Sequence, residues 1–248
     1  YWTIGLFVGS GALTVAFVHR IRHAENPLIP AHYFRRRNFV MPMVLRATSN
    51  FAYFGAFFLF PLLMEKGYGY SIPHVGALAI ARPLTFALSS PIAGYVAVRI
   101  GERVSALAGA TFLTGSLAMF SLLHPSSGAW FVAIALALSG LGMGTAMPSS
   151  SSVMANEVKV SEFGVMSAAQ LLAMQVGEVA GIQVLETVQQ ALVRRRGLEN
   201  AKPGPALLAT FHLPFLIGSC VAVLGLIAAT FMRSIPRDHP HRRSPDDR

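Results

Sequence analysis

The chain has 248 residues, of which 53% are hydrophobic and 12% are charged, and it carries a formal charge of +9 with one cysteine. A soluble domain contains about 25% charged residues, so this composition argues against a soluble enzyme and a disordered chain. A single cysteine excludes an internal disulfide scaffold. The apolar residues lie in long runs, and several runs reach the roughly 20 residues that cross a bilayer.

Seven apolar runs predict seven transmembrane helices. In hydrocarbon each backbone group needs an internal partner, and these runs are far longer than strands. Pro83 and Pro91 predict bends in the third run, because proline has no backbone donor. The predicted spans are residues 1–18, 39–64, 75–98, 104–123, 130–153, 163–192 and 207–232.

Basic residues in the connections predict the orientation of these spans. If the C-terminus is cytoplasmic, most Lys and Arg of the connections lie on the cytoplasmic side, as the positive-inside rule requires. The cluster at residues 194–196 is the local exception. The excess positive charge therefore reflects membrane topology, and we expect membrane lipid but no nucleic acid as a partner.

The longer connections divide the chain into regions. Residues 19–38 are basic and contain Pro27 and Pro30, which predicts a cytoplasmic loop with a short surface-lying piece near residues 31–34. Residues 233–248 are rich in Arg, Asp and Pro, which predicts a disordered cytoplasmic tail. The apolar run at residue 1 has no initiator Met and no signal-peptide pattern. We therefore expect this sequence to begin inside a longer protein.

Polar and aromatic side chains in the second span follow one stripe, because Arg46, Asn50, Tyr53 and Phe57 recur at helical spacing. Charged groups in hydrocarbon are costly, so this stripe predicts a wet cavity that binds an amphipathic solute. The alternative is that Arg46 extends to the cytoplasmic headgroups. In the third span, Arg82 is either a cation of the cavity or part of a gate, or else it pairs with a lipid phosphate or a neighbouring Glu.

The sixth span carries a polar face with Gln175 and Glu178, and Glu178 lies near its middle. Apolar surroundings disfavour a charged carboxylate, so Glu178 is a candidate for taking up and releasing a proton. The alternative is a structural ion pair with an arginine of another span. The residues predicted to line a substrate cavity are Arg46, Asn50, Tyr53, Arg82, Gln175 and Glu178.

The fifth span contains Gly140, Gly142 and Gly144, followed by Pro148. A Gly-x-Gly-x-Gly pattern can mark a nucleotide loop, but no strand precedes it here. It instead predicts a helix that other helices approach closely, and Pro148 permits a kink that could act as a gate. No arrangement of side chains predicts a catalytic site, a metal site or a cofactor.

The connection between the third and fourth spans resembles a loop of the major facilitator superfamily. Gly94, Arg99, Gly101 and Arg103 match the family pattern G-x-x-x-D-R-x-G-x-R/K, and Val98 occupies the acidic position. In that family the loop latches neighbouring helices at the cytoplasmic face.

Four further segments resemble the fourteen-helix drug:proton antiporters of this superfamily, in the same order and spacing. These segments are the linker at residues 26–39, Gly69-Tyr70-Ser71 with Gly76, Gly140-x-Gly142-x-Gly144 with Pro148, and Gln175-x-Gly177 with Gly181.

The resemblance implies an all-α membrane protein in which residues 1–18 form a transmembrane linker helix. Residues 39–232 would be the C-terminal six-helix bundle, built as two inverted three-helix repeats. The implied function is proton-driven export of small amphipathic organic compounds by alternating access. Such export would need the N-terminal bundle of the same protein, which this sequence lacks.

The sequence is also compatible with a second hypothesis, in which the protein is a complete seven-helix receptor or light-driven pump. The number of spans and their orientation fit it. The last span has no Lys that could carry a retinal Schiff base, which argues against the pump. A membrane enzyme has no supporting feature.

Overall fold

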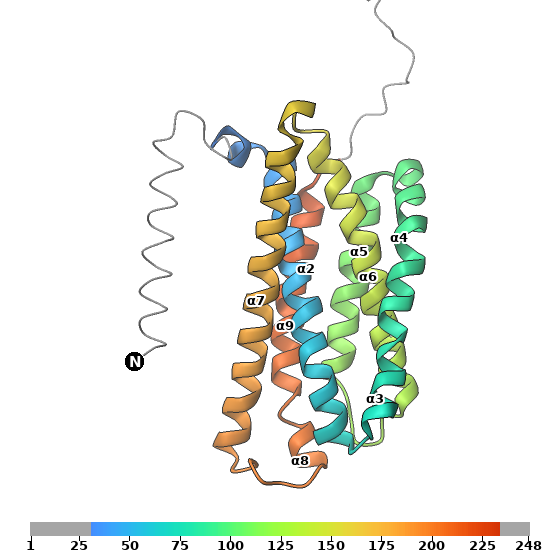
Figure 1. The fold of residues 1–248 in the computed structure, drawn as a ribbon, viewed down its shortest axis with the longest axis vertical. Helices are drawn as coiled ribbons and strands as arrows, with labels where there is room; N and C mark the ends of the chain where they lie inside the picture. Colours follow the sequence, from blue (N-terminus) through green and yellow to red (C-terminus); the bar gives the residue numbers. More distant parts are fainter. Residues whose placement is uncertain (1–30, 234–248) are drawn as a thin grey trace, which may run out of the picture.

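A computed structural model describes residues 31–233, and every regular element in this range is helical. Figure 1 shows long helices side by side in one bundle. Within the described range, six helices are long and apolar enough to cross a membrane. The predicted span at residues 1–18 and residues 234–248 of the predicted tail lie outside this range.

The described spans follow the predicted apolar runs closely. Three short pieces, η1 (Ala31–Arg35), η3 (Val160–Glu162) and α8 (Pro205–Leu208), lie in the connections, and η1 coincides with the predicted surface piece. The spans are α2 (Arg37–Leu62) with its wider last turns η2 (Leu63–Gly67), α3 (Ile72–Ala79) followed by α4 (Ala81–Ile100), α5 (Glu102–Ser121), α6 (Ala129–Ala155), α7 (Phe163–Arg195) and α9 (His212–Phe231).

The third span differs from the single bent helix that its prolines predict. α3 ends at Ala79, and α4 begins at Ala81 after Ile80. Pro83 has no amide hydrogen to donate to the carbonyl of Ala79, which explains an interruption one turn before this proline. Pro91 lies inside α4 and does not end the helix.

The bundle contains two sets of three helices with matching contacts. The contact between α2 and α7 corresponds to the contact between α6 and α4. The contact between α5 and α6 corresponds to the contact between α9 and α2. α5 and α9 also pack on each other. Exchanging α2 with α6, α4 with α7 and α5 with α9 therefore reproduces the contact pattern. Two repeats related by a two-fold axis, as the resemblance implies, would have such a contact pattern.

The main apolar core lies between α2, α5, α6 and α9, where the rings of Phe120 and Phe215 stack with centroids 5.0 Å apart. α4 and α7 lie at opposite sides of the bundle (Figure 1). In the most apolar stretch of each span, 17% of the residues are buried for the span of α4 and 28% for the span of α7. The corresponding fraction in the other four spans is 44–50%. α4 and α7 therefore leave wide apolar surfaces uncovered.

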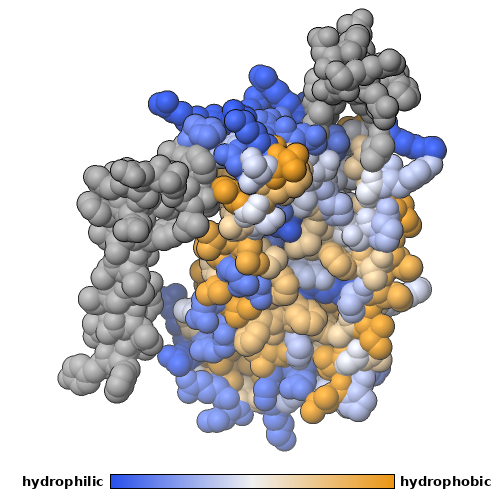
Figure 2. Space-filling model, turned by 45° about the horizontal axis from the view of Figure 1, so that its top comes forward, coloured by the Kyte–Doolittle hydropathy of each residue, from blue (hydrophilic) through white to orange (hydrophobic). Residues whose placement is uncertain are grey.

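Hydropathy follows the bundle axis, as expected for a protein in a bilayer. Figure 2 shows hydrophilic residues gathered at the top and bottom of the visible face, with hydrophobic residues mostly between them. The exposed apolar side chains of α4 include Leu84, Leu88 and Ile92, and those of α7 include Leu171 and Val176. In water such a surface would drive aggregation, whereas in a membrane it faces lipid or another apolar bundle.

The glycines of α6 serve two neighbours. Gly140 and Gly144 face α4, and a side chain at either position would overlap that helix. Gly142 faces α5, where a Cβ would lie 2.7 Å from the backbone nitrogen of Leu113. Residues two apart in a helix point in nearly opposite directions, so the Gly-x-Gly-x-Gly pattern allows α6 to fit between two helices. Pro148 lies within α6, which continues to Ala155.

The glycines of α7 let it approach α2 closely. Side chains at Gly177 and Gly181 would overlap the backbone of α2 at Ala47 and Phe51. Gly55 of α2 faces Gly181 in return, since a Cβ there would lie 2.8 Å from the Gly181 carbonyl oxygen. Small residues at such contacts let backbones pack where the hydrophobic effect contributes little.

Candidate functional site

A cavity of about 290 Å³ lies among α2, α4, α6 and α7. α2 and α4 are not among the described helix pairs that pack closely, and the cavity occupies the gap between them. We call it the aromatic cavity. Its lining residues are Tyr53, Phe54 and Phe57 of α2, Arg82, Pro83 and Phe86 of α4, Met143 and Met147 of α6, and Met174 of α7.

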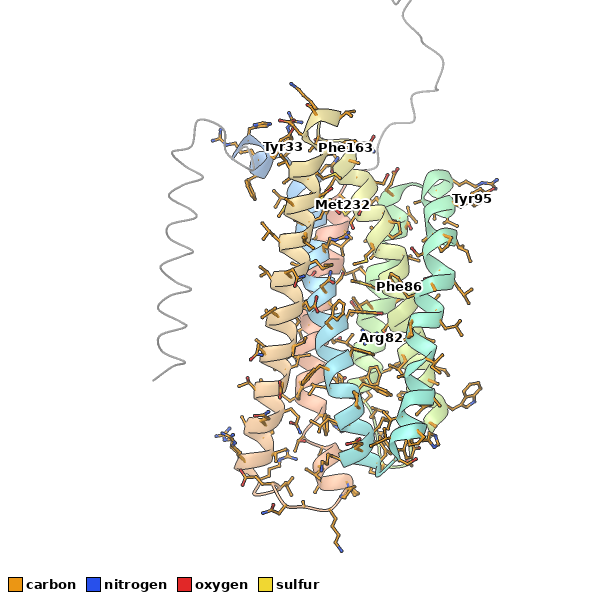
Figure 3. All side chains as sticks on the ribbon, viewed as in Figure 1. Tyr33, Arg82, Phe86, Tyr95, Phe163 and Met232 are labelled. Atoms are coloured by element: carbon orange, nitrogen blue, oxygen red, sulfur yellow. The ribbon has the colours of Figure 1, made fainter. Side chains whose placement is uncertain are left out.

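Arg82 is the charged group of the aromatic cavity, and only 2% of its surface is exposed. Its Nη2 donates a hydrogen bond to the backbone carbonyl of Tyr53. The guanidinium carbon lies 3.4 Å from the ring centroid of Tyr53 and 4.9 Å from that of Phe57. Figure 3 places Arg82 and Phe86 near the middle of the bundle's height, whereas Tyr95 points outward from α4.

The position of Arg82 depends on a glycine of the neighbouring helix. Gly140 of α6 lies directly against the carbonyl of Arg82 and the hydroxyl of Thr85, so any side chain there would push α4 away. The helix break at Ile80 allows α4 to start just before Arg82. Local sequence and packing together therefore turn this guanidinium toward α2.

A second polar group joins α2, α6 and α7 nearer the N-terminal end of α2. Arg46 donates to the hydroxyls of Ser150 and Ser151 at 3.5 and 3.1 Å, and Ser151 donates to Gln170 at 3.1 Å. We call these residues the serine cluster. Arg46 Nε, Asn50 Oδ1 and Gln170 Nε2 are buried without a partner in the described residues. Buried polar atoms usually have a partner, so this region can form further hydrogen bonds, with Arg46 Nε and Gln170 Nε2 as donors and Asn50 Oδ1 as an acceptor.

The polar stripe of α2 is divided between these two places. Tyr53 and Arg82, both predicted to line a substrate cavity, lie together in the aromatic cavity, and its role in binding a substrate stays a prediction. Arg46 and Asn50 lie in or beside the serine cluster, where the Asn50 amide donates to the Arg46 carbonyl at 2.7 Å. Arg46 therefore binds serines of α6 in this structure.

The two predicted residues of α7 do not line the aromatic cavity. Gln175 is exposed, and Glu178 is half-buried one turn after Met174. Residues four apart share a helix face, so Glu178 continues the face that Met174 presents to the cavity. Glu178 forms no ion pair with any residue in the range 31–233.

The apolar lining of the cavity is not predicted by the polar residues of the sequence. Met143 and Met147 lie one turn apart on α6, a spacing that fits a structural core equally well. Their partners Phe86 and Met174 come from other helices, so only the fold brings them together. Methionine side chains are flexible and polarizable, and they suit a cavity that accepts varied shapes.

The loop between α4 and α5 consists of Gly101 alone. Gly101 has φ +97°, a backbone angle that residues with a Cβ rarely adopt, so this turn requires glycine. Gly94 has open space around it, and Arg103 is exposed. Arg99 lies 4.4 Å from the ring centroid of Tyr95.

A carboxylate in the first turn of α5 contacts α6. Glu102 follows Gly101 directly and accepts a hydrogen bond from Ser152 of α6 at 3.4 Å. Val98 stands at the acidic position of the resembled pattern. In this chain the carboxylate beside the loop therefore lies after Gly101, at the start of α5.

The model of the Major Facilitator Superfamily matches residues 1–182. The chain belongs to the major facilitator superfamily. This membership and the six described spans confirm the predicted all-α membrane fold, and they disfavour the receptor or light-driven pump.

The names of several curated proteins of similar sequence refer to transport or to multidrug resistance. The chain is 24% identical over 191 residues to the multidrug transporter protein MdtP of Bacillus subtilis, covering 77% of this chain and 35% of MdtP. It is 27% identical over 192 residues to the multidrug resistance protein Stp of Mycobacterium tuberculosis, covering 76% and 36%. It is 25% identical over 259 residues to the uncharacterized MFS-type transporter EfpA of the same species, covering 97% and 48%. The chain thus spans a third to a half of the length of these superfamily relatives.

Proposed function

We propose that this chain is part of a secondary active transporter that exports amphipathic organic compounds by alternating access. The aromatic cavity carries the proposal, because it lies between helices of both three-helix repeats and combines an apolar lining with one charged group. Carrier sites lie near the membrane midplane at the interface of repeats. The names of MdtP and Stp, which refer to multidrug transport and multidrug resistance, support drug-like cargo.

Residues 39–232 form the C-terminal six-helix bundle in this proposal, and residues 1–18 are a linker helix of a fourteen-helix protein. The uncovered surfaces of α4 and α7 support this view, since a second bundle would cover them. The greater length of the relatives supports it as well. The excess of Lys and Arg in one set of connections supports a cytoplasmic C-terminus.

Glu178 is the proposed proton-coupling residue of this bundle. It is half-buried on the face of α7 that follows Met174, and it has no ion pair in the described residues. Ionisable groups within a span are costly and persist where they serve a pathway. In this proposal Gln175 extends the polar surface of α7, and the serine cluster around Arg46 and Asn50 lines the cytoplasmic part of the pathway.

The test is energised efflux by the full-length protein in a host without its own drug pumps. Efflux of a fluorescent amphipathic dye is measured with and without a protonophore for wild type, Glu178→Gln and Glu186→Gln. Glu186 is a matched control, because it lies on the same helix and accepts a hydrogen bond from Gln190 at 2.8 Å. We expect protonophore-sensitive efflux that Glu178→Gln slows at least about a hundredfold, the low end of the contribution of a positioned proton-transfer group.

Two outcomes would contradict the proposal. Normal efflux by the Glu178→Gln variant would show that Glu178 is not the residue that couples transport to protons. Absence of energised efflux for every compound of a chemically varied panel would refute export as the function.

A further inference from the structure

The aromatic cavity has an uncompensated positive charge. Arg82 is its one charged lining residue, and no Asp or Glu lines it. The one ion pair within residues 31–233 joins Arg36 and Glu157, which lie just before the start of α2 and just after the end of α6. A guanidinium remains protonated in proteins, so the charge of Arg82 is permanent.

The aromatic rings of the cavity are not free to bind a cation. Ring faces attract organic cations, so a cavity with Tyr53 and Phe57 could suit a lipophilic cation. Here the Arg82 guanidinium already lies 3.4 and 4.9 Å from the centroids of these two rings. A second cation on the same faces would meet like charge in a buried place, which disfavours cationic cargo.

Arg82 also has unused hydrogen-bond donors. A guanidinium offers five N–H groups, and the described structure records one bond, from Nη2 to the Tyr53 carbonyl. Nε is buried without a partner. If Arg82 only tied α4 to α2, these donors would stay unsatisfied at a free-energy cost. An oxyanion supplies acceptors in the planar geometry that a guanidinium fits best.

We infer that the aromatic cavity selects amphipathic compounds that carry an acidic group, and that Arg82 binds this group. Phe86, Met143, Met147 and Met174 hold the apolar part of the compound, and the flexible methionines accept different shapes. The inference rests on the proposed transport function, since it names the class of cargo for the same site.

The test uses two probes with the same apolar body and opposite charges, pyrenebutanoate and pyrenebutyltrimethylammonium. Equilibrium binding of each probe is measured by pyrene fluorescence with the full-length protein in phosphatidylcholine nanodiscs, and the signal of empty nanodiscs is subtracted. We expect wild type to bind the carboxylate at least about tenfold more tightly than the ammonium compound, and Arg82→Gln to lose this preference. Arg37→Gln is the matched control, because Arg37 also lies over a ring, 5.0 Å from the centroid of Phe231, at the end of α2.

Arg82→Lys tests the geometry of the site and serves if Arg82→Gln fails to fold. Lysine keeps the charge but loses the planar fork, so we expect weaker binding of the carboxylate with the preference retained. Melting temperatures report folding of each variant. Equal or tighter binding of the ammonium probe by wild type would overturn the inference, as would an equal loss of both probes in a folded Arg82→Gln.

The outcomes separate this inference from the proposed function, because probe binding needs no proton gradient. A preference for the carboxylate without any energised efflux would refute export and leave the cargo class standing. Energised efflux together with a preference for the ammonium probe would refute the cargo class alone.

Discussion

A few side chains hold the segment before α2 to the connection between α6 and α7. Tyr33 is 2% exposed and donates a hydrogen bond to the Glu162 carboxylate. Arg36 Nη1 donates to the Glu157 carbonyl at 2.9 Å and lies 3.8 Å from the Glu157 carboxylate. Exposed ion pairs contribute only about 0–1 kcal/mol, so the buried tyrosine is the stronger part of this contact. The contact fixes the end of the 19–38 connection against the helices that carry the serine cluster.

This contact depends on pH through Tyr33. The hydrogen bond to Glu162 raises the pKa of Tyr33 above its ordinary value of 10.0. The folded protein therefore holds the phenol proton to higher pH than the unfolded chain does. The stabilisation is complete below about pH 10 and is lost as the pH rises through the folded-state pKa. We expect the melting temperature of wild type to fall more steeply than that of Tyr33→Phe above about pH 10.

Thermal unfolding of both proteins in the same detergent, at steps from about pH 8 to about pH 11, measures this difference. Other titrating groups are common to both proteins and cancel in the comparison. Parallel curves would show that Tyr33 does not contribute.

At the scale of elements, the close contacts between helices depend on glycine rather than on apolar area. The contact between α2 and α7 has Gly177 and Gly181 on one side and Gly55 on the other. The contact between α6 and α4 has Gly140 and Gly144. Since lipid is as apolar as a leucine side chain, van der Waals packing and hydrogen bonds drive such contacts. A single methyl group at these positions must therefore separate two helices.

This argument predicts opposite effects for two glycines of α7. Gly177→Ala would place a methyl group against the Ala47 carbonyl, and we expect overpacking to destabilise the protein by about 1–3 kcal/mol. Gly164 in the first turn of α7 has no neighbour within 4 Å of an added Cβ. Gly164→Ala should be neutral or stabilise by up to about 1 kcal/mol, because alanine favours the helix.

Unfolding of both variants and wild type in increasing dodecyl sulfate measures the difference. Equal stability of Gly177→Ala and Gly164→Ala would contradict the packing argument. Loss of efflux with unchanged stability in Gly177→Ala would instead give this glycine a role in helix movement.

At the scale of the whole molecule, the length of the apolar runs made the membrane fold predictable. Bilayer thickness fixes the length of a span, and six described helices coincide with predicted runs. The sequence predicts less well which faces of these helices contact one another. Arg46 and Tyr53 share one stripe, but seven residues of helix separate them by roughly 10 Å, so they meet different neighbours. Arg46 reaches Ser151, whereas Tyr53 reaches Arg82.

The surroundings of Arg82 were also not predictable from the sequence. A buried arginine is visible in the sequence as a candidate, because few charged groups lie within spans. Whether it pairs with a carboxylate or lines a cavity depends on the gap between α2 and α4. That gap follows from tertiary packing, including the glycine contact that holds α4 on α6.

The surfaces of α4 and α7 lead to a prediction about the whole protein. These helices flank the aromatic cavity and are the least buried of the described spans, so we propose that a second bundle covers them. Expressed alone, the chain should insert into the membrane without energised efflux, because one bundle cannot alternate access around a shared cavity. Co-expression with the preceding part of its gene as a separate chain should restore efflux, and the two chains should copurify.

Arg82→Gln in the co-expressed chain should change the cargo and leave copurification intact, since Arg82 faces α2 rather than an exposed surface. Energised efflux by the chain alone would refute the view that it is one half of the transporter.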